Sequence, residues 1–307
     1  MSDDEDRIID VEGREITISH PHKLLFPDDN ITKFELAAYY AKASGVALRH
    51  YRDRALSMHR YPDGIDADDF FHKNIPDYFP DWIDRATLPK EGGEVTHVVA
   101  NNAATLVYLA NQGCITPHLA LSRIDRPEHP DRMIFDLDPS DDDFGKVRDT
   151  ARHLGELLDD LKLTSFVQTT GSRGLHVIVP LDREAEFDVV RKFSHRVCRT
   201  LADRHSDLMT VEQRKAKRGN RVFLDDLRNA YGQTSVAPYA VRARPGAPIA
   251  TPLEWDEIGA GDLTPRKYRL DNIFRRLGQR DDPWADIARH AQGLGEAERR
   301  LSGRMAN

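Results

Sequence analysis

Residues 133–139, MIFDLDP, form a short apolar run that carries two carboxylates two residues apart. In an extended strand successive side chains point to opposite faces, so Asp136 and Asp138 share one face while Phe135 and Leu137 take the other. Two carboxylates on one face repel each other unless a cation lies between them, and a divalent metal is the usual one. Because Pro139 ends the strand, we expect the pair at the strand's end.

The sequence after this run predicts that it is the first strand of a sheet. Apolar residues recur at helical spacing in two segments, and three short β-type runs accompany them. In chain order these are helix 144–161, strands 165–168 and 175–179, helix 186–205 and strand 221–224. This order is the split βαββαβ plan of an α+β fold, in which two helices back an antiparallel sheet. The usual version of that plan would place Asp136 and Asp138 beside the strand that carries His176.

The rest of the chain predicts one further module and two late helices. The predicted organisation is a disordered acidic tail at 1–12, an N-terminal α/β module at 13–125 and a core at 126–307. Helices are predicted at 33–49 and 103–112 in the module, and at 264–277 and 284–301 after the sheet. The run at 235–243 is short and strand-like.

Composition excludes several classes of protein. The chain has 307 residues, 39% of them hydrophobic, which is enough for a sizeable core. No apolar run approaches the ~20 residues of a membrane span, and the acidic start is unlike a signal peptide, so we expect a cytoplasmic protein without a membrane partner. Cys114 and Cys198 are the only cysteines and have no CxxC companion, which predicts two small buried side chains. A net charge of -7 argues against coating nucleic acid through bulk positive charge, although local basic patches could bind it.

Two further features are predicted to fall on the same sheet. Residues 170–176, TGSRGLH, combine two glycines with a hydroxyl, a guanidinium and an imidazole. The backbone N–H groups of such a turn, with Ser172 and Arg173, suit an anionic phosphate. Asp225 ends the last strand, and Asp226 should face the other way. A strand-end aspartate is most often a turn residue, but three carboxylates at strand ends beside a phosphate-suited turn form a natural two-metal site.

Cations and aromatic residues elsewhere leave two interpretations open. Five cations crowd 214–221, where an exposed charge run is the simple explanation. Arg242 and Arg244 share a face by alternation, and a triphosphate would be a partner for them. Phe70 and Phe71, before His72 and Lys73, could stack a base, although a buried aromatic pair is commoner. From pattern alone, His118 is a structural histidine on an apolar loop, and Lys23 and Lys33 are solvated.

Four motifs together resemble one family. They are FDLDPS at 135–140, TTGSRGLHVIVPL at 169–181, RVFLDDLRN at 221–229 and SVAPYAVRARPGAPIATPL at 235–253. The chain resembles the primase-polymerase domain of bacterial DNA ligase D and its stand-alone relatives, in the archaeo-eukaryotic primase superfamily, from Ile18 to about Tyr268. The resemblance implies an RRM-like catalytic sheet with the N-terminal module packed against it.

The resemblance also implies roles for individual residues. Asp136, Asp138 and Asp225 would be catalytic and hold two Mn2+ or Mg2+ ions, and Lys23 and Lys33 would bind a DNA 5′-phosphate. The nucleotide would be bound by Ser172, Arg173, His176, His118, Arg218, Arg242, Arg244, Arg60, Phe70 and Phe71. Relatives tend to have a Lys-Arg pair before the turn at 62–64, whereas this chain has His59-Arg60.

The implied function is template-directed nucleotidyl transfer at short DNA gaps or broken ends. NTP or dNTP would be the substrate, with ribonucleotides accepted, and the protein would be cytoplasmic and nucleoid-associated. A ligase domain would need more chain than 307 residues leave, so we expect joining to depend on a separate DNA ligase and an end-binding protein. Two alternatives stay open: a metal-dependent phosphodiesterase or nuclease that uses the same aspartates, and a non-catalytic module that binds DNA ends or gaps.

Overall fold

The computed structural model describes residues 5–305 and divides the chain into two compact units. Unit 1 comprises the residues up to Ala120 together with Thr234–Ala250 and Tyr268–Arg280. Unit 2 comprises Leu121–Gln233, Thr251–Lys267 and the residues from Asp281 onward. The chain first passes from unit 1 to unit 2 between Ala120 and Leu121, close to the predicted boundary at 125. Later segments return to unit 1, so no single cut in the sequence separates the two units.

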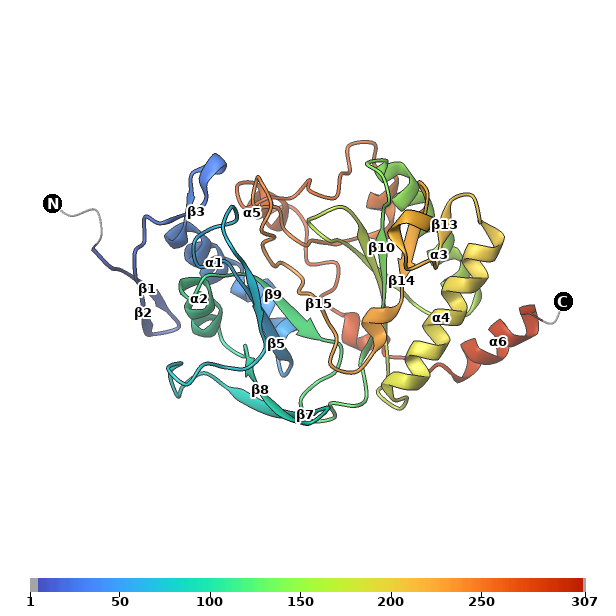
Figure 1. Ribbon diagram of the computed structural model, residues 1–307, viewed down its shortest axis with the longest axis horizontal. Coiled ribbons are helices and arrows are strands. Elements are labelled where there is room, and N and C mark those ends of the chain that lie inside the picture. Colours follow the sequence, from blue (N-terminus) through green and yellow to red (C-terminus); the bar gives the residue numbers. More distant parts are fainter. Residues whose placement is uncertain (1–4, 306–307) are drawn as a thin grey trace. The chain divides into compact units, whose positions relative to one another are not determined.

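Unit 2 is built on a six-stranded sheet (Figure 1). In spatial order its strands are β13 (Met209–Thr210), β14 (Val222–Asp225), β10 (Arg132–Asp138), β12 (Leu175–Pro180), β11 (Phe166–Thr169) and β16 (Pro252–Leu253). The inner order β14-β10-β12-β11 confirms the predicted split βαββαβ plan, because the first and third strands of the plan, β10 and β12, are neighbours. β13 and β16 add one short strand at each edge.

Two helices, α3 (Phe144–Asp160) and α4 (Phe187–Arg204), lie on one side of this sheet (Figure 1). α3 begins where the Asp143 side chain accepts a hydrogen bond from the Gly145 backbone N–H at 2.9 Å, and its apolar stripe is buried. The buried stripes are Val147, Ala151, Leu154 and Leu158 in α3, and Phe187, Val190, Phe193, Val197 and Leu201 in α4. With that face covered, the other face of the sheet remains for polar side chains.

Unit 1 contains a second sheet, whose pairings are all antiparallel, and two long helices besides the short α5 described below. The sheet has the order β15 (Thr234–Val236), β9 (Cys114–Ala120), β5 (Ala55–Arg60), β8 (Gly93–Val99) and β7 (Arg85–Lys90), and β6 (Phe70–His72) also pairs with β5. The remaining strands form two small ladders, β1 (Arg7–Val11) with β2 (Arg14–Ile18), and β3 (Leu24–Phe26) with β4 (Ile31–Thr32). The two long helices are α1 (Lys33–Tyr51) and α2 (Ala103–Asn111), which pack on each other.

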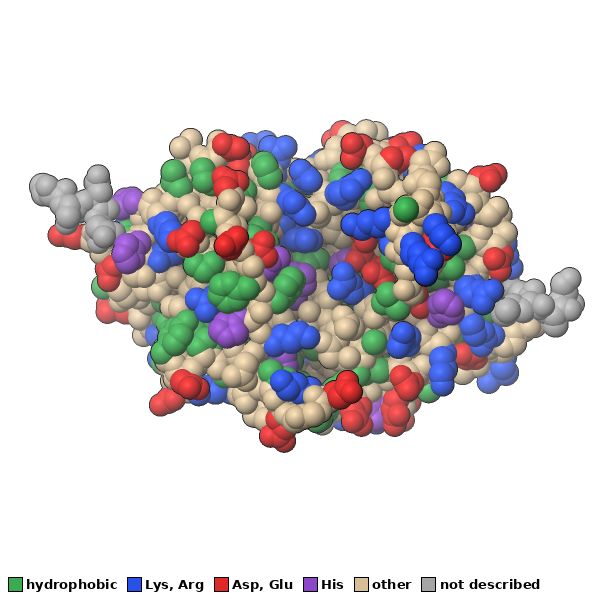
Figure 2. All heavy atoms as spheres, viewed as in Figure 1, with side chains coloured by type: hydrophobic (Ala, Val, Ile, Leu, Met, Phe, Trp, Pro, Cys, Tyr) green, Lys and Arg blue, Asp and Glu red, His purple; other side chains and the backbone are tan. Residues whose placement is uncertain are grey.

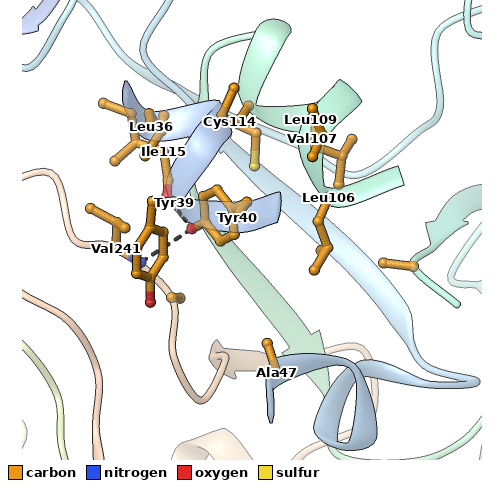
Figure 3. Packing of buried hydrophobic residues seen from close by; sticks show 14 of the residues in the cluster. Leu36, Tyr39, Tyr40, Ala47, Leu106, Val107, Leu109, Cys114, Ile115 and Val241 are labelled. Atoms are coloured by element: carbon orange, nitrogen blue, oxygen red, sulfur yellow. Dashed lines mark hydrogen bonds between the residues drawn. The ribbon is translucent and has the colours of Figure 1, made fainter. Parts of the chain in front are cut away.

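The core of unit 1 joins early and late parts of the chain. The hydroxyl of Tyr40 on α1 donates to the carbonyl of Ile115 at 2.7 Å and accepts from the N–H of Val241 at 3.1 Å (Figure 3). Tyr39 donates in the same way to the carbonyl of Tyr239. Thr116 Oγ1 donates to the Val241 carbonyl at 2.7 Å. These contacts, with the pairing of β15 and β9, explain why 234–250 belongs to unit 1.

Several sequence predictions differ from the structure. The tail predicted at 1–12 lies outside the described residues at 1–4, and residues 7–11 form β1 because they pair with β2. The run at 235–243 is a strand only to Val236. The late helices are short: α5 covers Ile273–Leu277 and belongs to unit 1, and α6 covers Gly295–Met305.

The cap of α1 and the burial of both cysteines agree with the sequence predictions. Thr32 caps α1 through a reciprocal pair of hydrogen bonds with Glu35. Cys114 and Cys198 are both buried. Over residues 5–305, none of the helices has the length and apolarity needed to cross a membrane.

Candidate active site

Three carboxylates meet on the open face of the sheet in unit 2. The strand register places Asp136 on β10 opposite His176 on β12 and opposite Asp225 on β14. Directly paired residues project on the same face, and Asp138 shares that face with Asp136. Ligand oxygens of the three aspartates all lie within 4.8 Å of one another. The strand neighbours predicted for the aspartate pair are therefore confirmed, and we call Asp136, Asp138 and Asp225 the acidic cluster.

The next residue, Asp226, faces away from the cluster. Its Oδ2 lies 3.2 Å from Nδ1 of His195 on α4, on the helical side of the sheet. Asp225 is oriented locally, because its Oδ1 accepts the Leu227 backbone N–H at 2.9 Å. The two aspartates therefore lie on different sides as predicted, although β14 ends at Asp225 and Asp226 already has helical backbone angles, so strand alternation is not the cause.

The acidic cluster is short of positive charge. Burial, followed by the neighbouring charge of Asp136, raises the pKa of Asp138 to about 6 although His176 opposes the shift. Burial also raises the pKa of Asp225. His176 Nε2 lies 3.4 Å from Asp136 Oδ1, and Arg228 Nε lies 3.8 Å and 3.9 Å from oxygens of Asp136 and Asp225. Closely spaced carboxylate oxygens with excess negative charge are the donor set that a hard divalent cation prefers, so the residues present fit such an ion.

The raised pKa of Asp138 predicts how the stability of the metal-free protein depends on pH. The unfolded carboxyl titrates near pH ~4, so between that value and pH 6 the folded form binds a proton that the unfolded form does not. Acidification from pH 7 to 5 should therefore add roughly 1–2 kcal/mol through this group, allowing for its partial exposure. Unfolding in EDTA measures the effect, with Asp138→Asn as the reference. The variant should be more stable than wild type at pH 7 and lose that advantage at pH 5, and an advantage independent of pH would contradict the prediction.

The turn between β11 and β12 is held by Thr170. Its Oγ1 accepts the N–H groups of Ser172 at 3.3 Å and Gly174 at 3.2 Å, and it donates to the Gly174 carbonyl. Two of the N–H groups that were expected to face a phosphate are thus used inside the turn. A Cβ on Gly174 would lie 2.1 Å from the carbonyl oxygen of Leu137, so this position requires glycine for the turn to approach β10.

Two predicted nucleotide ligands of unit 2 are braced by backbone carbonyls. Arg173 donates to the Asp141 carbonyl at 2.9 Å and lies 3.5 Å from the Asp142 carboxylate. Arg218 packs its guanidinium 3.7 Å from the ring centroid of Phe223. Because Phe223 is paired with Asp138, this stacking places Arg218 on the face of the acidic cluster.

In unit 1 the aromatic pair Phe70-Phe71 is exposed, not buried. The two rings project from opposite faces of the ladder that β6 forms with β5. His59 pairs with Phe71 across the ladder and stacks on it with ring centroids 4.0 Å apart. Phe71 also meets the ring of His118 edge-on at 5.1 Å. Arg60 pairs with Phe70 and lies over its ring at 5.5 Å. His59 and Arg60 therefore cannot both line one pocket, and His59 is the one that shares a face with Phe71 and His118.

His118 lies in the strand β9, not on the loop predicted for it. The sequence did not predict this strand because the adjacent residue is Pro117, and proline is rare inside sheets. The Pro117 carbonyl accepts the Ala237 N–H at 3.1 Å, so the proline nitrogen faces the side on which β15 has just ended at Val236. The strand therefore tolerates the missing donor at this position.

Arg242 and Arg244 do not lie in a strand, although they remain close together. The Arg244 N–H donates to the Arg242 carbonyl at 2.8 Å, which makes a tight turn. Both guanidinium groups act to lower the pKa of Tyr61, but burial dominates and raises that pKa to about 12. The ring of Tyr61 is tilted by 43° against that of His59 with centroids 4.6 Å apart, so the two arginines lie near the face of Phe71.

The two lysines predicted to bind a 5′-phosphate lie at the start of α1. The backbone N–H of Lys33 donates to the carbonyl of Lys23 at 2.8 Å, which brings the residues together. Lys33 is only 7% exposed and its Nζ donates to Ser19 Oγ at 3.1 Å. Lys23 pairs with Asp63 at 2.5 Å. Lys33 is therefore buried, whereas the sequence pattern alone suggested a solvated lysine. Both cations lie beside the N-terminus of a 19-residue helix.

Sequence reasoning missed two residues that follow Asp225. Arg228 forms ion pairs with Asp136 and Asp225 of the acidic cluster. The sequence feature that could have revealed it is its spacing of three residues from Asp225, which is one 3-10 turn. Asn229 is fully buried, and its amide exchanges hydrogen bonds of 2.7 Å and 2.8 Å with the backbone of Ile134. Its side chain replaces a strand where β14 has ended and so keeps β10 in place.

Comparison with known proteins gives one consistent result. The family model "LigD, primase-polymerase domain" matches residues 32–284. The chain is 33% identical over 292 residues to the multifunctional non-homologous end joining protein LigD of Pseudomonas aeruginosa, covering 94% of this chain and 35% of that protein. It is 30% identical to the bifunctional LigD of Bacillus subtilis, covering 88% of this chain and 44% of that protein.

A solved structure agrees with these relatives. The polymerase domain of Mycobacterium tuberculosis ligase D in complex with DNA superposes with a TM-score of 0.84 at 29% sequence identity. The match covers 90% of this chain and 99% of that one. The similarity thus extends over both units, whereas the chain spans less than half the length of the curated relatives that it matches.

Proposed function

The chain belongs to the LigD primase-polymerase family, and on that premise we propose that it is a metal-dependent nucleotidyltransferase that extends a primer 3′-hydroxyl at short gaps or broken ends of DNA. The observation that carries the proposal is the acidic cluster, in which three carboxylates converge from neighbouring strands on an open sheet face. A turn suited to phosphate lies directly beside it, because Gly174 contacts the backbone of Leu137.

The acidic cluster would hold two divalent cations, Mn2+ or Mg2+. Bound there, such ions would lower the pKa of a primer 3′-hydroxyl and neutralise charge on the nucleotide phosphates during in-line attack at the α-phosphate. The chain's own part is to fix the carboxylates. Asn229 anchors β10, the Leu227 N–H orients Asp225, and His176 lies 3.4 Å from Asp136.

Each unit, taken by itself, contains side chains that we assign to nucleotide binding. In unit 2 we assign Ser172, Arg173, His176 and Arg218 to the triphosphate, because cations and hydroxyls on fixed loops suit phosphate oxygens. In unit 1 the exposed ring of Phe71, backed by His59 and His118, offers a surface on which a base can stack. Arg242 and Arg244 complete this assignment, whereas Arg60 and Phe70, which the sequence also assigned to the nucleotide, lie on the opposite face of the ladder from Phe71.

The decisive experiment is extension of a primer opposite a one-nucleotide gap that bears a 5′-phosphate. Purified protein with Mn2+ should add the templated nucleotide, and each NTP and dNTP is supplied in turn to measure sugar preference. EDTA should stop the reaction. Degradation of the primer instead of extension would identify a nuclease, and tight gap binding in EDTA without any extension would identify a binding module. Either outcome would overturn the proposal.

Lys33 provides a prediction about the DNA end. Its amine is held by Ser19 at the helix N-terminus, where a charge-assisted hydrogen bond to a phosphate contributes about 1.5–3 kcal/mol. Lys33→Ala should therefore weaken binding to a 5′-phosphorylated gap by roughly 10- to 100-fold and leave a 5′-hydroxyl gap unchanged. Fluorescence anisotropy on the two gaps measures this difference.

A matched control is Lys42→Ala, an exposed lysine on the same helix. It should alter neither affinity. Asp63→Asn, which frees Lys23 from its carboxylate partner, should strengthen binding to the phosphorylated gap. An equal loss on both gaps for Lys33→Ala would remove the proposed role of the residue.

The wider biological setting is proposed as well. The relatives are named for non-homologous end joining. We assign the sealing of the extended end to a separate DNA ligase that works with an end-binding protein. Work on broken DNA would place the protein in the cytoplasm in association with the nucleoid.

A further inference from the structure

The loop between β13 and β14, residues 211–221, contains five cations that the structure divides into two kinds. Arg218 and Arg221 turn inward. Arg218 donates to the carbonyls of Glu212 at 2.9 Å and Gln213 at 2.8 Å, and Arg221 donates to the carbonyls of Arg218 at 2.9 Å and Lys217 at 3.0 Å. Both guanidinium groups thus donate to backbone carbonyls, and Arg221 also reaches the Ser206 carbonyl just before β13 at 3.4 Å. The stacking of Arg218 on Phe223 fastens the loop to β14.

The other three cations, Arg214, Lys215 and Lys217, point to solvent, and we call them the basic triad. All three are exposed, and none of the carboxylates in the described part of the chain forms an ion pair with them. Glu212 is the nearest acidic residue in sequence, and its carboxylate accepts the backbone N–H of Arg214. Figure 2 shows Lys and Arg side chains gathered over the region of β13 and β14. In a chain with a net charge of -7, this arrangement is a local positive surface on a braced support.

The loop lies at the end of the sheet that carries the acidic cluster. β14 begins directly after it, and the second residue of β14, Phe223, pairs with Asp138. Lys146 on α3 ties the loop to the segment after β10, because its amine contacts both Asp141 and the carbonyl of Asn220. Lys146 also serves as a contrast, since its charge has a carboxylate partner whereas the basic triad has none.

We propose that the basic triad binds the sugar-phosphate backbone of the DNA whose end is being extended. This inference rests on the proposed function and adds a contact surface to it. Exposed, unpaired and fixed cations suit a line of phosphates that comes from solvent and releases counterions when it binds. A nucleotide triphosphate is the less suitable occupant, because it must reach the acidic cluster, where the inward-turned Arg218 already lies.

The test is the salt dependence of DNA binding, measured in EDTA so that no catalysis occurs. Each phosphate contact contributes about -0.9 to the slope of log K against log salt concentration. Lys215→Ala combined with Lys217→Ala should make the slope less steep by about 1.8, which is roughly a 60-fold loss of affinity at 0.1 M salt if affinities converge at 1 M. The probe is a gapped duplex of defined sequence, and a second sequence should give the same change.

The matched control removes two cations from elsewhere in unit 2. Lys192→Ala with Arg199→Ala changes exposed positions on α4, on the helical side of the sheet, and should leave the slope unchanged. Lys215→Arg with Lys217→Arg keeps the charge and should restore the wild-type slope. If the alanine pair behaves like the control, the proposal is wrong. It is equally wrong if that pair weakens binding of nucleotide with Mn2+ while the DNA slope stays the same.

Failure of this inference is distinguishable from failure of the proposed function. If the wild-type protein extends primers but the Lys215→Ala/Lys217→Ala variant has the same salt-dependence slope as wild type, only the proposed DNA contact is refuted. A protein that never extends a primer, yet shows the predicted change in slope, would refute the polymerase assignment and leave the DNA contact standing.

Discussion

Replacement of Asp136 and Asp138 together by asparagine is expected to abolish primer extension. The change keeps the shape of both side chains but removes two of the three negative charges in the acidic cluster, so divalent cations lose their hard anionic ligands. Metal ions contribute several kcal/mol to such transition states, so the loss should be at least ~10³-fold. Single-turnover extension with Mn2+ measures the rate, and calorimetric titration of Mn2+ reports the site independently of activity.

A stability measurement separates this effect from misfolding. In the metal-free protein the aspartates repel each other, and their mutual charge contributes to the raised pKa of Asp138. The double variant should therefore unfold at a higher temperature than wild type at pH 7, even though it is inactive. Affinity for a 5′-phosphorylated gap in EDTA should persist, because Lys23 and Lys33 lie in unit 1.

Asp226→Asn is the matched control for the acidic cluster. Asp226 is the next residue after Asp225, but it contacts His195 on the helical side of the sheet. It should retain extension. Wild-type activity in the Asp136/Asp138 double variant, or equal inactivation by Asp226→Asn, would contradict the assignment of the cluster.

The second large effect is expected from Gly174→Ala, a change of one methyl group. A Cβ at this position would lie 2.1 Å from the Leu137 carbonyl oxygen, far inside van der Waals contact, and the obstructing atom is backbone. Either β10 or the turn must move, at a cost of about 3 kcal/mol, which lowers the melting temperature of a domain of this size by roughly 6–12 °C. Thermal unfolding measures the loss.

Because Leu137 lies between Asp136 and Asp138, the same movement should disturb the acidic cluster. Gly174→Ala should therefore weaken Mn2+ binding in the fraction that remains folded. Gly259→Ala, where nothing lies within 4 Å of the added Cβ, should change neither property. A melting temperature unchanged by Gly174→Ala would show that the turn has more room than the structure gives it.

The central strands of unit 2 and the aspartates that they carry could be predicted from sequence, because they follow from short-range sequence patterns. Alternation in MIFDLDP determines which face Asp136 and Asp138 take, and the order of helices and strands determines their neighbours. His176 and Asp225 consequently lie where the plan placed them. Arg228 was not predicted as part of the site, because its position depends on a 3-10 turn that begins only after the strand ends.

Long-range pairing explains the failures. Residues 264–277 have helical spacing, but the Tyr268 carbonyl accepts the Ile249 N–H and the Leu270 N–H donates to Ala247, which prevents helix formation until Ile273. In the segment 284–301, Gln292 bridges to the backbone of Thr164, and α6 begins only at Gly295. The phosphate-suited turn was recognised, but the capture of its N–H groups by Thr170 depends on a side-chain rotamer that composition does not reveal.

The return of residues 234–250 and 268–280 to unit 1 has a consequence for synthesis on the ribosome. Tyr39 and Tyr40 are made early, yet their hydroxyl partners Tyr239 and Val241 emerge about 200 residues later, and β9 waits as long for β15. The earlier part of unit 1 therefore cannot reach its final packing as an early independent step, and the edge of β9 stays exposed until residues 234–236 have emerged. Shortened transcripts or stalled ribosomes would release a chain in which neither unit is complete, and such a chain is a substrate for proteases and chaperones.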